Sequence, residues 1–505
     1  MKTIISGSVA GAMFIMVNLA LAPTASGQSS STPWVYTLVN GSQLLDDCPF
    51  CDHVSRPVPM WGTFQLRLLV EGPIFSSYAV ENITFQAGSP GGMTYKVTGQ
   101  GSYTFGGEVA NLQTLSLTLL IDDGVSPVQG YFTNDSSLVT RQWPMMQVSV
   151  TQTNGTVGSV FHLSINAAPF REIWFSTAQP FTAGVWNPPS NSISAGDLLS
   201  SVGQVVKRNG QLCGQLGIMP PVPDEGLKDI GILPGGEIAF SIEQDVFSES
   251  LGGLHAGDLL TDRGRILSTN SELLSAFVPS PVPPDGAGLA AVKVGDNGAV
   301  YLFSVQTNFY SAKLGRTIQT GDLLDDSGDV VRSEAQLLAN FNPAKPAADY
   351  GLSAVFQWPL SGEVWFTTTQ GFADLGTNYY AAGDLLSDQG YVVYRNSELL
   401  SAFAPAAGGT NFGLDALYVI TDVPPLGIPE NGLGPASLAR PQPTNQPPAS
   451  LAFDWSARGH VFQLERATNP VGPYLPASRI DTDGPFLDPG VLTNQAQAFY
   501  RLHQW

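Results

Sequence analysis

The chain has 505 residues, of which 43% are hydrophobic and 13% charged; this apolar content suffices for packed cores and excludes wholesale disorder. Its formal net charge of −20 excludes the usual electrostatic footprint of a nucleic-acid-binding protein and argues against attachment to an anionic membrane surface. The 54 glycines and 38 prolines indicate frequent turns and few long helices, so we expect several domains in an all-β chain.

The first residues have the layout of a secretory signal peptide. A single lysine, Lys2, precedes an apolar stretch from Ile4 to about Ala22, and small residues follow it. We therefore predict that residues 1–27 are removed and that the mature protein is secreted or at the cell surface. A membrane anchor is the alternative, although polar residues interrupt the stretch. No later stretch reaches the ~18 uninterrupted apolar residues of a spanning helix, so no membrane span is expected.

Two cysteines, Cys48 and Cys51, are separated by a Pro-Phe pair, and this motif resembles the redox dithiol of glutaredoxins. Two prolines within the next eight residues cannot continue the helix that such a dithiol needs. We predict a small surface disulfide in an oxidising compartment, with redox chemistry as the alternative. A zinc site would need two further ligands, and only His53 is nearby.

Residues 32 to about 170 alternate apolar and polar side chains over several short runs separated by Gly and Asn turns. A period of two in such runs predicts an antiparallel β-sandwich or barrel, and a barrel can enclose a ligand. The clearest runs are Thr63–Leu69, Met93–Thr98, Leu115–Ile121 and Val148–Thr153.

An internal repeat occupies residues 171–420. The string Gly-Asp-Leu-Leu occurs four times, with spacings of 61, 64 and 62 residues. Each copy also has an aromatic strand ending in Phe, a turn glycine before paired aliphatic residues, and a Gly-Leu pair. Each unit of about 62 residues predicts four short strands and a turn of helix, as at Asn396–Phe403, where Asn396 can cap the helix. The glycines of the four strings are Gly196, Gly257, Gly321 and Gly383.

Units of this kind must stack to bury both faces of their sheets, and four sheets stacked around an axis form a four-bladed β-propeller. The first copy begins with its aromatic strand and has no Gly-Leu strand before it, whereas the last copy ends with the strand Gly413–Val419 and has no aromatic strand after it. We therefore expect the final strand to complete the first sheet and close the ring. In blade number and approximate unit length this architecture is similar to hemopexin-like propellers; an open array of β-hairpin units is the alternative.

The third cysteine, Cys213, lies in the repeat at a position where the other copies have leucine. We expect a buried thiol that acts as a small hydrophobe.

The best candidates for chemistry are the repeated aspartates. One follows the glycine of each string, and a second follows four residues later, except in the first copy, which has Ser201. Two hard oxygen ligands per turn can bind calcium, the one cofactor we consider. The alternative is that each aspartate accepts backbone N–H groups in a tight turn. The calcium candidates are Asp258 and Asp262, Asp322 and Asp326, and Asp384 and Asp388; Asp197 is the first-copy member.

Trp174 and Trp365 occupy one register of the repeat, directly before its phenylalanine. They are candidates for a sugar-stacking surface, with packing between blades as the alternative.

Residues 421–449 are crowded with Pro, Gly and Asn and are predicted to form an extended linker. The tail, residues 450–505, resembles a fibronectin type III module and is shorter than a full module, so its first strand is absent or comes from the linker. Such tails are similar to those of secreted bacterial proteins, where they serve as spacers or attachment modules. The resemblance rests on Leu451–Trp455, Val461–Thr468, Gly472–Tyr474, Phe486–Asp488 and Ala498–Leu502.

The sequence lacks a His-Glu-x-x-His motif, a Gly-x-Ser-x-Gly elbow and a Gly-rich phosphate loop before a helix. We therefore predict a secreted, non-enzymatic binding or scaffold protein whose propeller is an interaction platform for protein or carbohydrate at the cell surface. An extracellular glycan-acting hydrolase or lyase and a structural cell-envelope component are the alternatives.

Overall fold

The structure is a computed structural model. Its regular elements are almost all antiparallel strands, so the chain is all-β as expected. The described residues are 32–47, 57–89, 91–155, 160–184, 191–222, 224–283, 286–406, 411–424, 437–438, 442–444, 450–456, 458–484, 486–489 and 498–505. The predicted signal peptide and the Cys48–Cys51 disulfide lie outside these residues.

The helices of the structure are few and short, and each of them lies within the repeat region. They are followed by single 3-10 turns in the second, third and fourth copies. In the part of the chain that the structure describes, none is long and apolar enough to cross a membrane. Their bounds are α1 (Asn209–Leu212), α2 (Asn270–Leu274), η1 (Ser275–Phe277), α3 (Glu334–Leu337), η2 (Ala339–Phe341), α4 (Asn396–Leu399) and η3 (Ser401–Phe403).

The chain divides into two compact units. The larger unit comprises Ser29–Leu233 and Glu237–Gly432, and the smaller includes Pro234–Gly236 and Leu433–Trp505. The larger unit contains both the N-terminal strands and the repeat.

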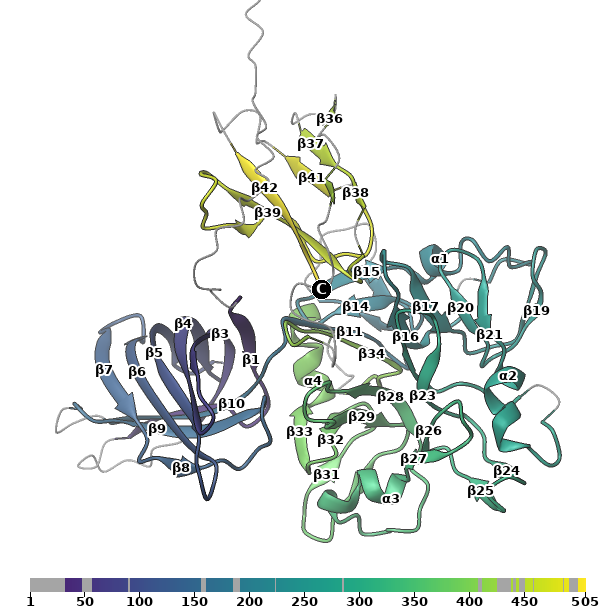
Figure 1. Cartoon of the computed structure of the whole chain (residues 1–505), viewed down its shortest axis with the longest axis horizontal. Coiled ribbons are helices and arrows are strands. Elements are labelled where there is room, and N and C mark those ends of the chain that lie inside the picture. Colours follow the sequence, from purple (N-terminus) through teal and green to yellow (C-terminus); the bar gives the residue numbers. More distant parts are fainter. Residues whose placement is uncertain are drawn as a thin grey trace, which may run out of the picture. The chain divides into compact units, whose positions relative to one another are not determined.

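The N-terminal strands form one ten-stranded antiparallel sheet that closes on itself, because β9 pairs with both β7 and β10 (Figure 1). Of the two expected architectures, these pairings match the barrel. We call this part the closed sheet. Its strands are β1 (Trp34–Leu38), β2 (Gln43–Asp47), β3 (Val58–Glu71), β4 (Phe75–Gly88), β5 (Thr94–Gly106), β6 (Leu112–Asp122), β7 (Val128–Thr133), β8 (Ser137–Leu138), β9 (Met146–Gln152) and β10 (Val160–Ala168).

The interior of the closed sheet is a packed hydrophobic core. Strand β6 shows the predicted alternation, because Leu115, Leu117 and Leu119 are buried and the residues between them are more exposed. Large side chains such as Tyr103 and Phe132 are completely or almost completely buried in the same core. Burial of these apolar side chains stabilises the closed sheet, because each Å² of apolar surface removed from water contributes about 25 cal/mol.

The repeat forms four antiparallel sheets of four strands each, which we call the four-sheet region (Figure 1). The sheet orders are β34-β11-β14-β15, β16-β17-β20-β21, β22-β23-β26-β27 and β28-β29-β32-β33. The bounds are β11 (Glu172–Ser176), β14 (Leu198–Ser200), β15 (Gln204–Lys207), β16 (Lys228–Ile232), β17 (Ile238–Ser241), β20 (Leu259–Thr261), β21 (Ile266–Ser268), β22 (Ala291–Val294), β23 (Val300–Ser304), β26 (Leu323–Leu324), β27 (Val330–Arg332), β28 (Leu352–Gln357), β29 (Val364–Thr368), β32 (Leu385–Ser387), β33 (Tyr391–Tyr394) and β34 (Ala416–Ile420).

Each copy also contributes a two-stranded ribbon outside its four-stranded sheet. The ribbons pair β12 (Phe181–Thr182) with β13 (Ser192–Ile193), β18 (Val246–Ser248) with β19 (Gly252–Leu254), β24 (Phe309–Ser311) with β25 (Arg316–Ile318), and β30 (Phe372–Ala373) with β31 (Tyr379–Tyr380).

The last strand of the repeat completes the first sheet, as the sequence predicts. β34 pairs antiparallel with β11, with Glu172 opposite Ile420 and Ser176 opposite Ala416. The first strands of the four sheets also contact one another in a closed cycle, β16 with β22, β22 with β28, β28 with β34 and β34 with β16. We call these four the inner strands.

Phenylalanine pairs connect neighbouring sheets at three of the four junctions. Phe277 packs edge-on against Phe303, with ring centroids 6.1 Å apart, and Phe341 packs edge-on against Phe366 at 6.5 Å. In the same way, the last copy contacts the first through Phe403 and Phe175, again at 6.5 Å. Edge-to-face pairs at these separations are favourable.

The predicted helix cap is wrong in detail. Asn396 is the first residue of α4, and the residue before it, Arg395, is the cap. The Asn396 side chain instead donates to the carbonyls of Gly383 (3.4 Å) and Gly413 (3.0 Å), and it accepts the N–H of Phe412 (2.9 Å). The amide group therefore joins the Gly-Asp-Leu-Leu turn to the Gly-Leu segment within one copy.

The smaller unit contains a two-stranded and two three-stranded antiparallel sheets. Strand β36 comes from the predicted linker and pairs with β37, so residues 421–449 are not an unstructured connection throughout. Phe453, Phe462 and Leu464 form its buried core. Its strands are β35 (Ser437–Leu438), β36 (Gln442–Thr444), β37 (Ser450–Phe453), β38 (Trp455–Ser456), β39 (Phe462–Ala467), β40 (Leu475–Pro476), β41 (Phe486–Pro489) and β42 (Phe499–Gln504).

Candidate functional site

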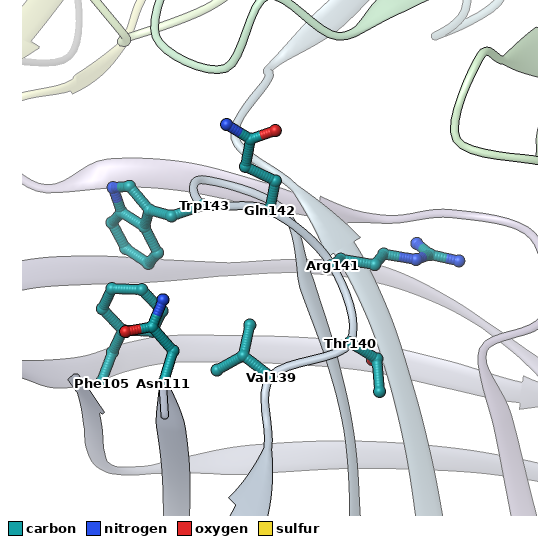
Figure 2. Close-up of a pocket in the computed structure, with 7 residues that line it drawn as sticks. All are labelled: Phe105, Asn111, Val139, Thr140, Arg141, Gln142 and Trp143. Carbon is teal, nitrogen blue, oxygen red and sulfur yellow. The ribbon is translucent and has the colours of Figure 1, made fainter. Parts of the chain in front are cut away.

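A hollow of about 400 Å³ opens on the closed sheet, between the end of β5, the start of β6 and the segment that joins β8 to β9. We call it the aromatic hollow. Its lining residues are Phe105, Asn111, Val139, Thr140, Arg141, Gln142 and Trp143 (Figure 2).

Aromatic rings form one side of the hollow. Figure 2 shows the rings of Trp143 and Phe105 close together with Asn111 beside them, and their centroids are 5.3 Å apart. Trp143 also packs against Tyr78 at 5.2 Å and Trp34 at 6.2 Å, so neighbouring rings hold it in place. A rigid apolar wall with a few polar groups is the usual composition of a small-ligand site.

Exposed polar side chains complete the lining. Asn111 and Gln142 are exposed and provide amide donors and acceptors. The hydroxyl of Thr140 donates to Oε1 of Gln147 at 2.9 Å, which orients it at the rim. Among the described residues that line the hollow, Arg141 is the one charged side chain.

Arg141 points away from Trp143 in Figure 2 and reaches the four-sheet region. Its guanidinium carbon lies 3.7 Å from the centroid of the Tyr391 ring, a cation–π contact. Burial lowers the pKa of Arg141. Its buried Nη1 has no hydrogen-bond partner among the described residues.

The hydroxyl of Tyr391 in turn donates to Glu363, a carboxylate that is 2% exposed. Trp365 Nε1 (2.9 Å) and Ser387 Oγ (2.6 Å) donate to the same oxygen, Oε1. Burial raises the pKa of Glu363, and its second oxygen has no hydrogen-bond partner in the described residues. This chain of contacts anchors the β8–β9 segment, and the carboxyl is too deeply buried to meet a substrate.

The four turn aspartates each accept backbone N–H groups. In the second copy, Asp258 accepts from His255 and from Asn270, both at 2.9 Å. Asp197 and Asp384 repeat this pattern, and an arginine adds a salt bridge of 2.6 Å to each. The remaining member, Asp322 of the third copy, accepts the N–H of Gln319 at 3.3 Å and that of Glu334 at 3.4 Å. Each carboxylate therefore ties its turn to the first residue of the following helix.

The second aspartate series is less uniform. Asp262 accepts the N–H of Ile238 at 3.0 Å, Asp388 that of Val364 at 3.2 Å, and Ser201 that of Ile173 at 3.1 Å. Asp326 is exposed. Within the described ranges, no group of three or more His, Cys, Asp or Glu side chains is arranged to hold a metal ion. The contacts are those of the tight-turn interpretation.

Trp174 and Trp365 are both completely buried, so neither indole lies on a surface that a sugar can reach. Trp174 donates to Glu172 at 3.3 Å, and Trp365 donates to Glu363. Their register pairs each indole with the glutamate two residues earlier, so both rings are packing residues of the four-sheet region.

Cys213 is buried, as expected, and the corresponding Leu274, Leu338 and Leu400 are buried too. Burial, with added repulsion from Glu225, raises the pKa of the Cys213 thiol to about 12. The thiol therefore stays protonated and unreactive at neutral pH.

Sequence reasoning missed a group of charged residues on the inner strands. Lys228 Nζ lies 2.6 Å from Asp415 Oδ2, and the next residue, Asp229, is completely buried. Burial raises the pKa of Asp229, against the lowering effect of backbone N–H donors. A break in the repeat could have identified it, because the other three copies have alanine at this register: Ala291, Ala354 and Ala416.

No family model matches the chain, and no curated protein matches it.

Proposed function

We propose that the protein is a secreted, non-enzymatic binding or scaffold protein that engages protein or carbohydrate at the cell surface. In this proposal the four-sheet region is a four-bladed β-propeller that acts as a rigid platform, and the smaller unit is a fibronectin type III-like spacer or attachment module. Export rests on the predicted signal peptide.

The observation that carries the binding role is the aromatic hollow, which lies on the closed sheet and is connected to the four-sheet region through the contact of Arg141 with Tyr391. The hollow is lined by the rings of Phe105 and Trp143 beside the exposed amides of Asn111 and Gln142. Sugars offer C–H faces that pack on aromatic rings and hydroxyls that bond to amides, so a glycan is the ligand that this lining favours.

The lining also argues against the hydrolase or lyase alternative. The described residues around the hollow include neither a carboxylate nor a histidine that can move a proton. The buried carboxyl of Glu363 lies behind Tyr391, and its three donors make it part of the packing.

A glycan array on the mature protein tests this function, followed by titration of any ligand found. The double variant Asn111→Ala and Gln142→Ala should weaken binding by at least about tenfold, since each lost ligand hydrogen bond contributes ~1 kcal/mol. Gln86→Ala, at an exposed position of β4, is the matched control. Binding that is unchanged in the double variant, or release of a cleaved product, would contradict the proposal.

A further inference from the structure

The inner strands have an unusual buried group at their centre. Each inner strand pairs on one side within its own sheet and contacts the inner strands of neighbouring sheets. N–H groups on the unpaired side of a buried strand need an acceptor, because a buried donor without one costs free energy.

One side chain, Asp229, meets this need for several strands. Its Oδ1 accepts the N–H of Ile230 at 2.7 Å and that of Leu417 at 3.4 Å, and its Oδ2 accepts the N–H of Val292. These three donors belong to β16, β34 and β22, which are the inner strands of three different sheets. They occupy the same position in their copies, four residues after the glycine of the Gly-Leu pair.

The backbone at Asp229 is shaped for this contact. Its φ is +48°, in the left-handed region, and the pairing of β16 with β17 shifts register between Lys228 and Ile230. A bulge of this kind redirects a side chain, at a local cost that the surrounding structure must offset. The three N–H contacts provide that compensation.

We infer that the N–H groups of Ile230, Val292 and Leu417 form a carboxyl-binding site at the centre of the four-sheet region, and that the Asp229 carboxyl group is its resident ligand. Convergent backbone N–H groups are a recognised site for carboxylates and other anions. The nearby Lys228 is already paired with Asp415, so the backbone donors are the direct partners of Asp229. A small planar carboxylate such as formate has the chemistry to replace the side chain.

Chemical rescue tests the inference. In the full chain, Asp229→Ala removes the carboxyl group and leaves the donors in place, so its unfolding midpoint should fall. Increasing sodium formate should raise that midpoint saturably, because a ligand that binds only the native state stabilises it. Sodium pivalate, a carboxylate too bulky for the vacated space, should not.

Leu289→Ala is the matched control, since Leu289 is completely buried beside β22 and its removal leaves a cavity without such donors. Equal responses of Asp229→Ala and Leu289→Ala to formate would overturn the inference. If Asp229→Ala does not fold in buffer, recovery of folded protein on refolding in formate but not in pivalate supports the inference, and failure in both contradicts it. Asp229→Asn, which fills the space, should show no saturable response.

Discussion

Glu334 accepts the backbone N–H of Tyr350 at 2.7 Å, in the register where the other three copies have an asparagine. In the second copy Asn270 makes the equivalent bond to Ala287 and also donates to two carbonyls, those of Gly257 and Gly288. An ionised glutamate cannot donate, so the third copy has a carboxylate at a site shaped for an amide.

Stability should therefore depend on pH through Glu334. Burial raises the pKa of Glu334 from 4.5 to about 7. Between these values the folded state binds more protons than the unfolded state, so the free energy of unfolding decreases as pH rises through this window, by at most about 3 kcal/mol. Glu334→Asn should remove this decrease. Urea unfolding of the wild type and of Glu334→Asn between pH 4.5 and 7.5 measures this dependence. Glu249→Gln, at an exposed position, is the control. A decrease as large in Glu334→Asn as in the wild type would contradict the assignment.

The turn aspartates should matter for stability without calcium. Asp258→Ala leaves the buried N–H of Asn270 and the partly buried N–H of His255 without this acceptor, and should lower the free energy of unfolding by about 1–3 kcal/mol. Asp326→Ala, at an exposed position, should change it by less than about 0.5 kcal/mol. Denaturant unfolding with added calcium and with a chelator measures both. A wild-type midpoint that falls on chelation would instead favour the calcium hypothesis.

Closure by β34 should make the four sheets unfold together. Val419 is 3% exposed on this strand, and it packs in the core shared by the first and last copies. Val419→Asp buries a charge there and should lower the free energy of unfolding by more than about 3 kcal/mol. Tyr301→Asp, at an exposed strand position, is the control. Backbone amides in all four sheets of Val419→Asp should exchange hydrogen faster than in the wild type. Faster exchange confined to the first sheet would contradict cooperative closure.

Arg141 and Glu363 should be energetically coupled through Tyr391. Glu363 is buried and Arg141 is half-buried. Burial lowers the pKa of Arg141, and attraction to Glu363 raises it in part, so the two charges interact favourably. In a double-mutant cycle, Arg141→Met and Glu363→Gln should each lower the free energy of unfolding. The double variant should lose about 1 kcal/mol less than the sum of the two single losses. Strictly additive effects would show that the two charges do not interact.

The sequence by itself determined the periodic features of this protein. Alternation predicted the N-terminal strands, and equal spacing of four strings predicted four equivalent units and their closing strand, because each of these follows from local pattern and repetition. The burial of Cys213 followed from register alone, since its counterparts are leucines.

Only the tertiary structure decided which residues line the aromatic hollow and which polar side chains are buried among backbone donors. The aromatic hollow joins Phe105 and Trp143, which the sequence separates by 38 positions, and Asp229 meets donors from strands 63 and 188 residues away. Such contacts depend on how strands pack, and local pattern does not encode that packing. Asp229 and Glu334 depart from their own repeat, and the environment that makes each departure matter exists only once the four sheets are assembled.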